Sequence, residues 1–215
     1  MVSRGETVVA KSDTELPGSI DFSDATQVHS WITQTVQQRV WRPRFFAAIA
    51  AALHGSFDRA IDVVEFGSGT GYLAKEILGN CRIASYTAID VSPAIHDAAR
   101  EHLGEAARAV RFVVKNSRDE DWADEIATVD AVVTMPAASN DRLRSGRDKF
   151  FRRIREILRP EGLLLYCDHQ NRDLSREPGM AVTRDELPGA LRAAGFRRSD
   201  ELLELGGMIL VRAVA

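Results

Sequence analysis

The stretch Val64–Glu65–Phe66–Gly67–Ser68–Gly69–Thr70–Gly71–Tyr72 decides how this sequence is interpreted. It ends a short β-branched run, places three glycines at alternate positions and leads into an apolar segment with helical spacing. Because glycine lacks a Cβ atom, such a turn can adopt positive φ and bring its backbone against a ligand. In a doubly wound α/β fold this turn lies at the carboxyl edge of the sheet, where ligands bind. The stretch therefore predicts a strand, a ligand-binding turn and a helix.

An acidic residue follows at the end of the next predicted strand. Asp90 comes directly after the run 83–89 and can accept hydrogen bonds from both hydroxyls of a ribose. The turn and the acid together predict a nucleoside-containing ligand. The G-x-G-x-G spacing differs from the G-x-G-x-x-G of dinucleotide-binding proteins. Glu65 would repel a pyrophosphate but suit a cationic amino-acid group, so an NAD-dependent oxidoreductase is the less favoured alternative.

The alternation of strands and helices continues along the chain. Strands are predicted at 61–66, 83–89, 110–114, 129–134, 162–167, 196–205 and 208–214, and helices at 93–103, 141–159 and 183–195. Such alternation implies a mostly parallel sheet with right-handed crossovers and helices on both faces. Gly206–Gly207 is a hairpin signal that adds antiparallel pairing at one side. The predicted fold is a seven-stranded, Rossmann-like α/β sheet with a C-terminal antiparallel hairpin.

Three segments are expected along the chain. Residues 1–23 mix charge, glycine, proline and serine without periodicity, which predicts a flexible N-terminal arm. Residues 24–55 are expected to form a helical lid of two helices, divided at Pro43 and closed by Gly55. Residues 56–215 are expected to form the ligand-binding domain.

The composition argues against several classes of protein. The 215 residues are 45% hydrophobic and 27% charged, with a formal net charge of −3, which suits one globular domain. Cys81 and Cys167 are too few for a disulfide framework, which favours a cytoplasmic location. The longest apolar run, 45–53, is far shorter than the ~20 residues of a membrane span, and residues 1–10 show no secretory signal. Mild acidity argues against nucleic acid as the main partner.

The motifs resemble those of a known family. Residues 65–71 look like the first motif of class I S-adenosylmethionine (SAM)-dependent methyltransferases, and Asp90 matches the family's ribose-binding acid. The hairpin at 206–207 matches the family's antiparallel seventh strand, and 158–165 resembles the entry into its fifth strand. The resemblance covers about 60–215. It implies a methyltransferase that uses SAM and releases S-adenosylhomocysteine.

The resemblance also implies which residues contact the cofactor. By position they are Glu65, Gly67, Ser68, Gly69, Gly71, Asp90, Val91, Asn116, Ser117 and Met135. The glycines would hold the methionine part, with Glu65 on its ammonium side, and Val91 would line the adenine pocket. Asn116 and Ser117 occupy the place where the family usually holds the adenine amino group with an acid. Met135 would lie beside the sulfonium.

Methyl transfer depends largely on positioning, and a hydroxyl or protonated amine acceptor also needs a general base. His169 is the candidate catalytic base, with Asp168 or another carboxylate orienting it. Residues 134–140 lack the Asn/Asp-Pro-Pro-aromatic signature of enzymes that methylate exocyclic amines of bases or glutamine side chains. Candidate substrate contacts are Trp41, Arg42, Arg44 and Tyr72.

We therefore expect a small-molecule substrate with an oxygen or carboxylate acceptor. The histidines show no metal-ligand spacing, so no metal is expected. An RNA or protein methyltransferase and a non-methylating binding module with the same fold stay open as alternatives. The sequence leaves open whether the chain is a monomer or a homodimer.

Overall fold

The computed structural model describes residues 26–27, 30, 41–116, 119, 121–135, 144–169 and 184–215, without the side chains at 144, 145 and 169. The predicted arm, residues 24–25, 28–29 and 31–40 of the predicted lid, Ser117 and the segment 136–140 lie outside the described residues. None of the described helices is both long and apolar enough to span a bilayer.

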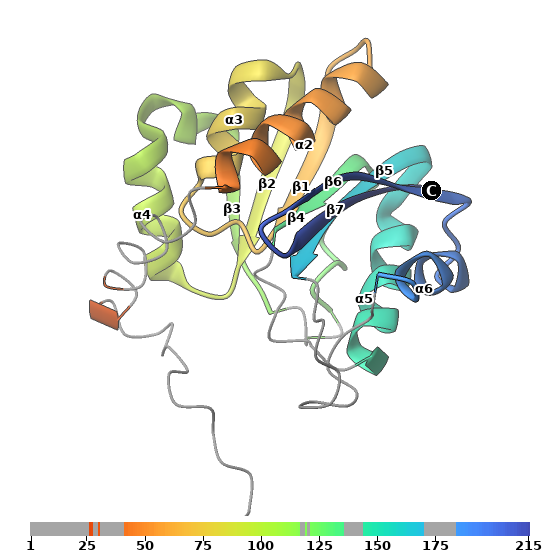
Figure 1. Cartoon of the computed structure of the whole chain (residues 1–215). Helices are drawn as coiled ribbons and strands as arrows, with labels where there is room; N and C mark the ends of the chain where they lie inside the picture. Colours follow the sequence, from red (N-terminus) through yellow and green to blue (C-terminus); the bar gives the residue numbers. More distant parts are fainter. Residues whose placement is uncertain are drawn as a thin grey trace, which may run out of the picture.

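Seven strands form one sheet in the order β3-β2-β1-β4-β5-β7-β6 (Figure 1). The strands are β1 (Ile61–Phe66), β2 (Ile83–Asp90), β3 (Val110–Val114), β4 (Val129–Thr134), β5 (Leu158–His169), β6 (Arg198–Leu205) and β7 (Met208–Val214). The first five strands pair in parallel, and β7 runs antiparallel to both β5 and β6. The predicted fold class is confirmed, including the closing hairpin.

Helices cover both faces of this sheet (Figure 1). The helical elements are α2 (Arg42–Ser56), α3 (Tyr72–Asn80), α4 (Pro93–Leu103), the 3₁₀ segment η1 (Gly104–Ala109), α5 (Arg144–Ile157) and α6 (Leu187–Ala193). On one face α2 and α3 pack through residues such as Ile49 and Leu73, and on the other α5 and α6 pack through Phe151 and Leu191. Burial of these two apolar layers holds the helices against the two faces of the sheet.

Several expected boundaries are wrong. The helix expected at 141–159 ends at Ile157 because β5 already begins at Leu158, and the helix expected at 183–195 begins at Leu187 and ends at Ala193. Two further differences have local reasons. Helix α2 does not end at Gly55 but continues to Ser56, and the amide of Phe57 still donates to a carbonyl of its last turn. The strand expected from Phe196 begins later, at Arg198. The Phe196 amide bonds back to a helical carbonyl, and Gly195 has φ 99°, which is the geometry of a glycine-terminated helix rather than of a strand.

Candidate functional site

The glycine-rich turn joins β1 to α3 at the carboxyl edge of the sheet. Gly67, Gly69 and Gly71 have φ of 70°, 53° and 80°, a left-handed backbone that favours glycine at each position. The amides of Gly67 and Ser68 donate to the Ile89 carbonyl at 2.8 and 3.0 Å. The turn is therefore tied to the end of β2, as the sequence predicts.

Asp90 reinforces this link. Its carboxylate is 7% exposed and accepts hydrogen bonds from the Gly69 amide at 2.9 Å and from the Val91 amide at 2.8 Å, one on each oxygen. Burial raises the pKa of Asp90, and the backbone donors oppose that rise. The Ser92 amide is a third backbone donor to this carboxylate, and since the two oxygens together have four lone pairs, Asp90 can accept a further bond from a ligand.

Glu65 lies directly beneath the turn. Its side chain is buried, and the Tyr86 hydroxyl donates to Glu65 Oε2 at 2.8 Å. Burial raises the pKa of Glu65 to about 8, although the Tyr86 hydrogen bond acts in the opposite direction. Tyr86 is not among the residues expected from the sequence, because a tyrosine in mid-strand carries no signal of the carboxyl group it faces.

The turn has features that fit an adenosyl ligand with an amino-acid tail. The Ser68 hydroxyl is buried and has no hydrogen-bond partner among the described residues. A Cβ at Gly69 would meet no atom within 4 Å, so open space borders the backbone there. Val91 and Val114 are 40% and 49% exposed at the ends of neighbouring strands, and Val114 pairs in register with Asp90. Such an apolar pair beside a carboxylate suits an adenine ring next to its ribose.

The structure adds an acid near Asn116. Asn116 is exposed just after β3, and its amide donates to Asp119 Oδ2 at 3.3 Å while its carbonyl accepts from the Asp119 amide at 3.1 Å. The carboxylate that 116 and 117 lack is therefore present in the same turn. In the sequence, the only sign of this contact is that Asp119 lies three residues after Asn116.

Two other expected site residues flank the turn. Met135 follows β4 at the same edge and is 5% exposed. Tyr72 opens α3 and is 39% exposed, and its ring lies 3.9 Å from that of His102 on α4. That contact gives Tyr72 a packing role between helices, and its contact with substrate stays a prediction.

The start of α2 reaches the carboxyl end of β5 and the hairpin turn. A Cβ at Gly206 would come within 3.0 Å of Trp41, so the indole packs directly on that turn. Burial raises the pKa of the Cys167 thiol, and the positive charge of Arg42 opposes this rise. Arg44 is exposed. Of the three expected lid contacts, Trp41 packs at this end of the sheet, and Arg42 follows it as the first residue of α2.

Asp168 contacts side chains of β5 and α5. Tyr166 donates to Asp168 Oδ2 at 2.5 Å, and Nη2 of Arg147, which is buried on α5, lies 3.2 Å from the same oxygen. The structure thus shows Asp168 bonded to β5 and α5. His169 ends β5 opposite Met208, and its catalytic role stays a prediction.

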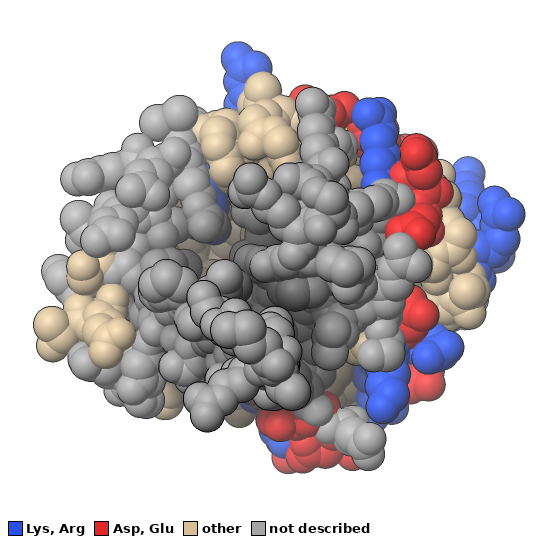
Figure 2. All heavy atoms as spheres, turned by 60° about the horizontal axis from the view of Figure 1, so that its bottom comes forward, with Lys and Arg blue, Asp and Glu red and all other residues tan. Residues whose placement is uncertain are grey.

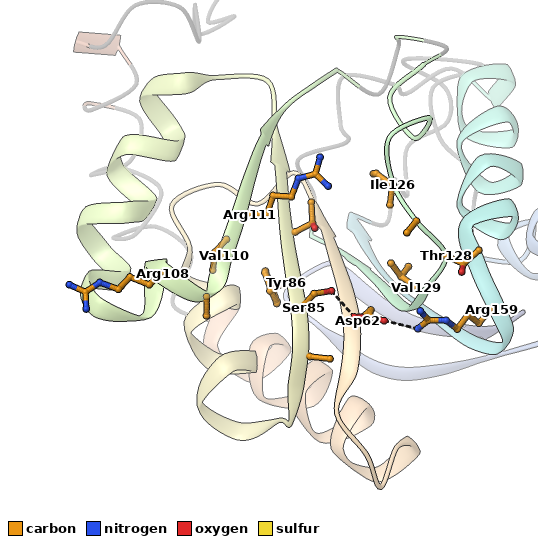
Figure 3. A pocket seen from close by; sticks show the side chains of 14 residues that line it. Asp62, Ser85, Tyr86, Arg108, Val110, Arg111, Ile126, Thr128, Val129 and Arg159 are labelled. Carbon is orange, nitrogen blue, oxygen red and sulfur yellow. Dashed lines mark hydrogen bonds and ion pairs between the residues drawn. The ribbon is translucent and has the colours of Figure 1, made fainter.

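A cavity of about 480 Å³ lies at the opposite, amino edge of the sheet (Figure 3). Val110 and Val129, the first residues of β3 and β4, contribute to its lining. Asp62 forms part of the same wall and accepts from the Ser85 hydroxyl at 2.7 Å and from Arg159 at 2.8 Å. These groups stabilise the beginnings of the strands and are not part of the candidate site.

Metal ligands do not cluster in the part of the chain that is described: no group of three or more His, Cys, Asp or Glu side chains there could hold an ion. The expectation of a metal-free site stays a prediction.

Figure 2 looks onto the carboxyl edge and shows acidic and basic side chains side by side along one margin.

Comparisons with known proteins agree with this geometry. A family model described as a methyltransferase domain matches residues 63–162, from β1 into β5. The reducing polyketide synthase Preu2 of Preussia isomera is 30% identical over 164 residues, which is 67% of this chain and 7% of that protein. The highly reducing polyketide synthase easB of Emericella nidulans is 30% identical over 137 residues, 58% of this chain and 5% of that protein. The chain thus spans only a small part of these curated relatives.

Solved structures show the same fold. An O-methyltransferase family protein from Burkholderia thailandensis superposes with a TM-score of 0.71 at 20% identity, covering 89% of this chain and 60% of that chain. Human N-acetylserotonin methyltransferase, solved in complex with SAM, has a TM-score of 0.65 at 18% identity, and the superposition covers 89% of this chain and 56% of that chain. A carbon methyltransferase and an N-methyltransferase share the fold at 16% and 15% identity.

Sheet order, glycine turn and acidic strand end together give the Rossmann-like α/β fold that these methyltransferases share. Residues 63–162 match a methyltransferase domain, and two of the solved neighbours, human N-acetylserotonin methyltransferase and the N-methyltransferase NodS of Bradyrhizobium japonicum, are complexes with SAM and S-adenosylhomocysteine.

Proposed function

We propose that this methyltransferase transfers the methyl group to an oxygen or carboxylate of a small metabolite. The observation that carries the proposal is the positive charge of Arg42, the first residue of α2, which acts on the Cys167 thiol near the carboxyl end of β5. This end lies next to Met135, beyond the glycine turn, on the side where an acceptor would face the methyl group. A guanidinium there can bind a carboxylate through two parallel hydrogen bonds.

A second basic group flanks the same strand end from α5. Arg147 is 8% exposed and contacts Asp168, which also accepts from Tyr166. Because Arg147 and Tyr166 both donate to the same Asp168 oxygen, the three groups form a rigid polar wall rather than a mobile charge. A polar wall on one side and Arg42 on the other suit an acceptor that carries its own charged or hydroxylated group.

The chemistry of methyl transfer determines what each group at the site would do. When bound, SAM supplies an electrophilic methyl group on a sulfonium. The glycine turn and Asp90 hold the adenosyl and amino-acid parts, while Arg42 orients the acceptor. Positioning of this kind supplies much of the rate enhancement. A carboxylate acceptor needs no base, whereas for a hydroxyl acceptor His169 would remove the proton.

The alternatives concern the acceptor. An RNA or protein substrate would be larger than the acceptor proposed here, and the described charges at the margin of the carboxyl edge are of both signs (Figure 2). Strongly salt-dependent binding to bulk RNA would favour the RNA alternative. A non-methylating binding module would bind SAM without releasing S-adenosylhomocysteine in the presence of a cell extract.

The test is an assay with SAM labelled on its methyl group and a panel of carboxylated and hydroxylated metabolites. We expect label in a small carboxylated or hydroxylated product. Arg42→Gln should raise KM for a carboxylated acceptor about tenfold or more and leave the affinity for SAM unchanged, since a hydrogen bond to a charged group is lost. Arg82→Gln is the matched control, because Arg82 is exposed and bonds to the Asp58 carbonyl at the amino edge. Label found only in RNA or protein would contradict the proposal.

A further inference from the structure

A buried carboxyl group and a buried hydroxyl face each other directly below the glycine turn. Glu65 on β1 and Tyr86 on β2 are each 1% exposed, and the hydroxyl donates to Glu65 Oε2 at 2.8 Å. Glu65 lies two residues before Gly67, where the turn begins. The pair therefore connects the interior of the sheet to the place where the cofactor's amino-acid part would lie.

The surroundings of Glu65 disfavour a negative charge. Its register partners are Ala88 on β2 and Val133 on β4, and both belong to the apolar cluster beneath α2 and α3. In the described part of the chain, Tyr86 is the group that hydrogen-bonds the carboxyl, and no cation pairs with it. A buried carboxylate without a cation is costly, so the free protein holds Glu65 as a neutral acid.

Few titratable groups act on this pair. Asp90, at the end of β2, raises the pKa of Glu65 further, and burial has already raised it to about 8. Cys81, just after α3, acts on Tyr86, whose own pKa burial raises well above its usual value. Tyr86 therefore remains a neutral donor throughout the range in which Glu65 titrates.

We propose that Tyr86 is a positioning residue for cofactor binding: burial keeps Glu65 a neutral acid in the free protein, and the Tyr86 hydroxyl holds its carboxyl group in place and stabilises the carboxylate that forms when the primary ammonium group of the cofactor binds. The inference rests on the SAM assignment. The Glu65 O–H bond breaks and its proton passes to water, while the Tyr86 hydroxyl continues to donate to the carboxylate. The new carboxylate and the ammonium form a neutral pair, so charge is balanced within the buried site.

The proton count of binding tests this directly. S-adenosylhomocysteine carries the ammonium group, and 5′-methylthioadenosine has the same nucleoside without it. Calorimetry in buffers of different ionisation enthalpy gives the number of protons released. With the Glu65 pKa at about 8, we expect S-adenosylhomocysteine to release about 0.9 proton at pH 7 and about 0.5 at pH 8, and 5′-methylthioadenosine to release none.

Two variants assign the effect to the pair. Glu65→Gln should abolish proton release. Tyr86→Phe removes the bond that favours the charged form of Glu65, so its affinity for S-adenosylhomocysteine should fall about tenfold at pH 7, less at pH 9, and not at all for 5′-methylthioadenosine. Ser85→Ala is the matched control, because Ser85 on the same strand donates to a different carboxylate, Asp62, at 2.7 Å. It should behave as wild type.

Several results would overturn the proposal. They are equal proton release with both ligands, no release with S-adenosylhomocysteine, and a Tyr86→Phe variant with wild-type affinity and pH profile. The wild-type and Glu65→Gln proton counts decide the question even if Tyr86→Phe does not fold. If neither ligand binds, the SAM assignment itself fails and the proposal falls with it, whereas proton release without turnover on small metabolites contradicts the proposed function alone.

Discussion

Replacing Asp90 removes the group that joins the glycine turn to the nucleoside site. Its oxygens accept the amides of Gly69 and Val91 at 2.9 and 2.8 Å, the Ser92 amide is a third donor, and the carboxylate still has a lone pair for a ribose hydroxyl. Asp90→Ala removes all of these interactions. Asp90→Asn keeps the shape of the side chain, but its amide nitrogen would face a backbone amide, and that backbone amide would lose its acceptor.

The magnitude follows from the number of bonds lost. A hydrogen bond to a charged group contributes about 1.5–3 kcal/mol, and part of this loss is recovered when water replaces the carboxylate. We therefore expect Asp90→Ala to weaken binding of S-adenosylhomocysteine by about 1–3 kcal/mol, which is roughly a 5- to 150-fold rise in Kd. Loss of two buried acceptors for backbone amides should also lower the melting temperature of the free protein.

Isothermal titration calorimetry measures the affinity, and circular dichroism shows whether each variant is folded at the temperature of the titration. Asp97→Asn is the control, since Asp97 is an exposed carboxylate on the neighbouring helix whose ion pair with Arg100 does not involve the turn. Its Kd should equal that of wild type. A folded Asp90→Ala variant that binds with a Kd within twofold of wild type would refute this placement of the ribose.

Three further predictions concern stability and catalysis. Asp130→Asn should destabilise the fold by about 2–3 kcal/mol in urea denaturation at pH 7, less than a fully buried pair because Arg59 reaches solvent. Since its ion pairs hold the pKa of Asp130 below the usual value of about 3.9, this stabilisation is complete above about pH 5 and is lost on acidification, so wild type and variant should converge in acid. Gly71→Ala should lower the melting temperature, because φ is 80° and the new Cβ would lie 3.2 Å from Leu103 Cδ1. His169→Ala should reduce kcat about 10²-fold or more on a hydroxyl acceptor with cofactor affinity unchanged, and a kcat within a few-fold of wild type would remove it from the mechanism.

Much of the fold could be predicted because its signals are local. The strand 61–66, the glycines of the turn and the acid at 90 lie within short stretches, and each is typical of one structural role. Gly206–Gly207 likewise marks the hairpin, where φ is 61° and 76°. Residues whose role depends on backbone conformation alone are therefore the ones that sequence indicates best.

Contacts between distant residues could not be predicted in the same way. The Tyr86 hydroxyl reaches Glu65 because two parallel strands lie side by side, and the contact of Arg147 with Asp168 depends on how α5 packs on β5. The expectation that Asp168 orients His169 uses their adjacency in the sequence and stays a prediction, while the contacts of Asp168 with Tyr166 and α5 depend on the packing of distant elements. Neighbours in space are decided by strand register and helix packing, which a single sequence does not contain.

The most direct test of the central claim is a crystal structure of the chain with S-adenosylhomocysteine. The account predicts the amino-acid part along the turn 67–71, the ribose hydroxyls within hydrogen-bond distance of Asp90, and the adenine between Val91 and Val114. An empty turn at saturating ligand, or the ligand bound at the amino edge near Asp62, would contradict it.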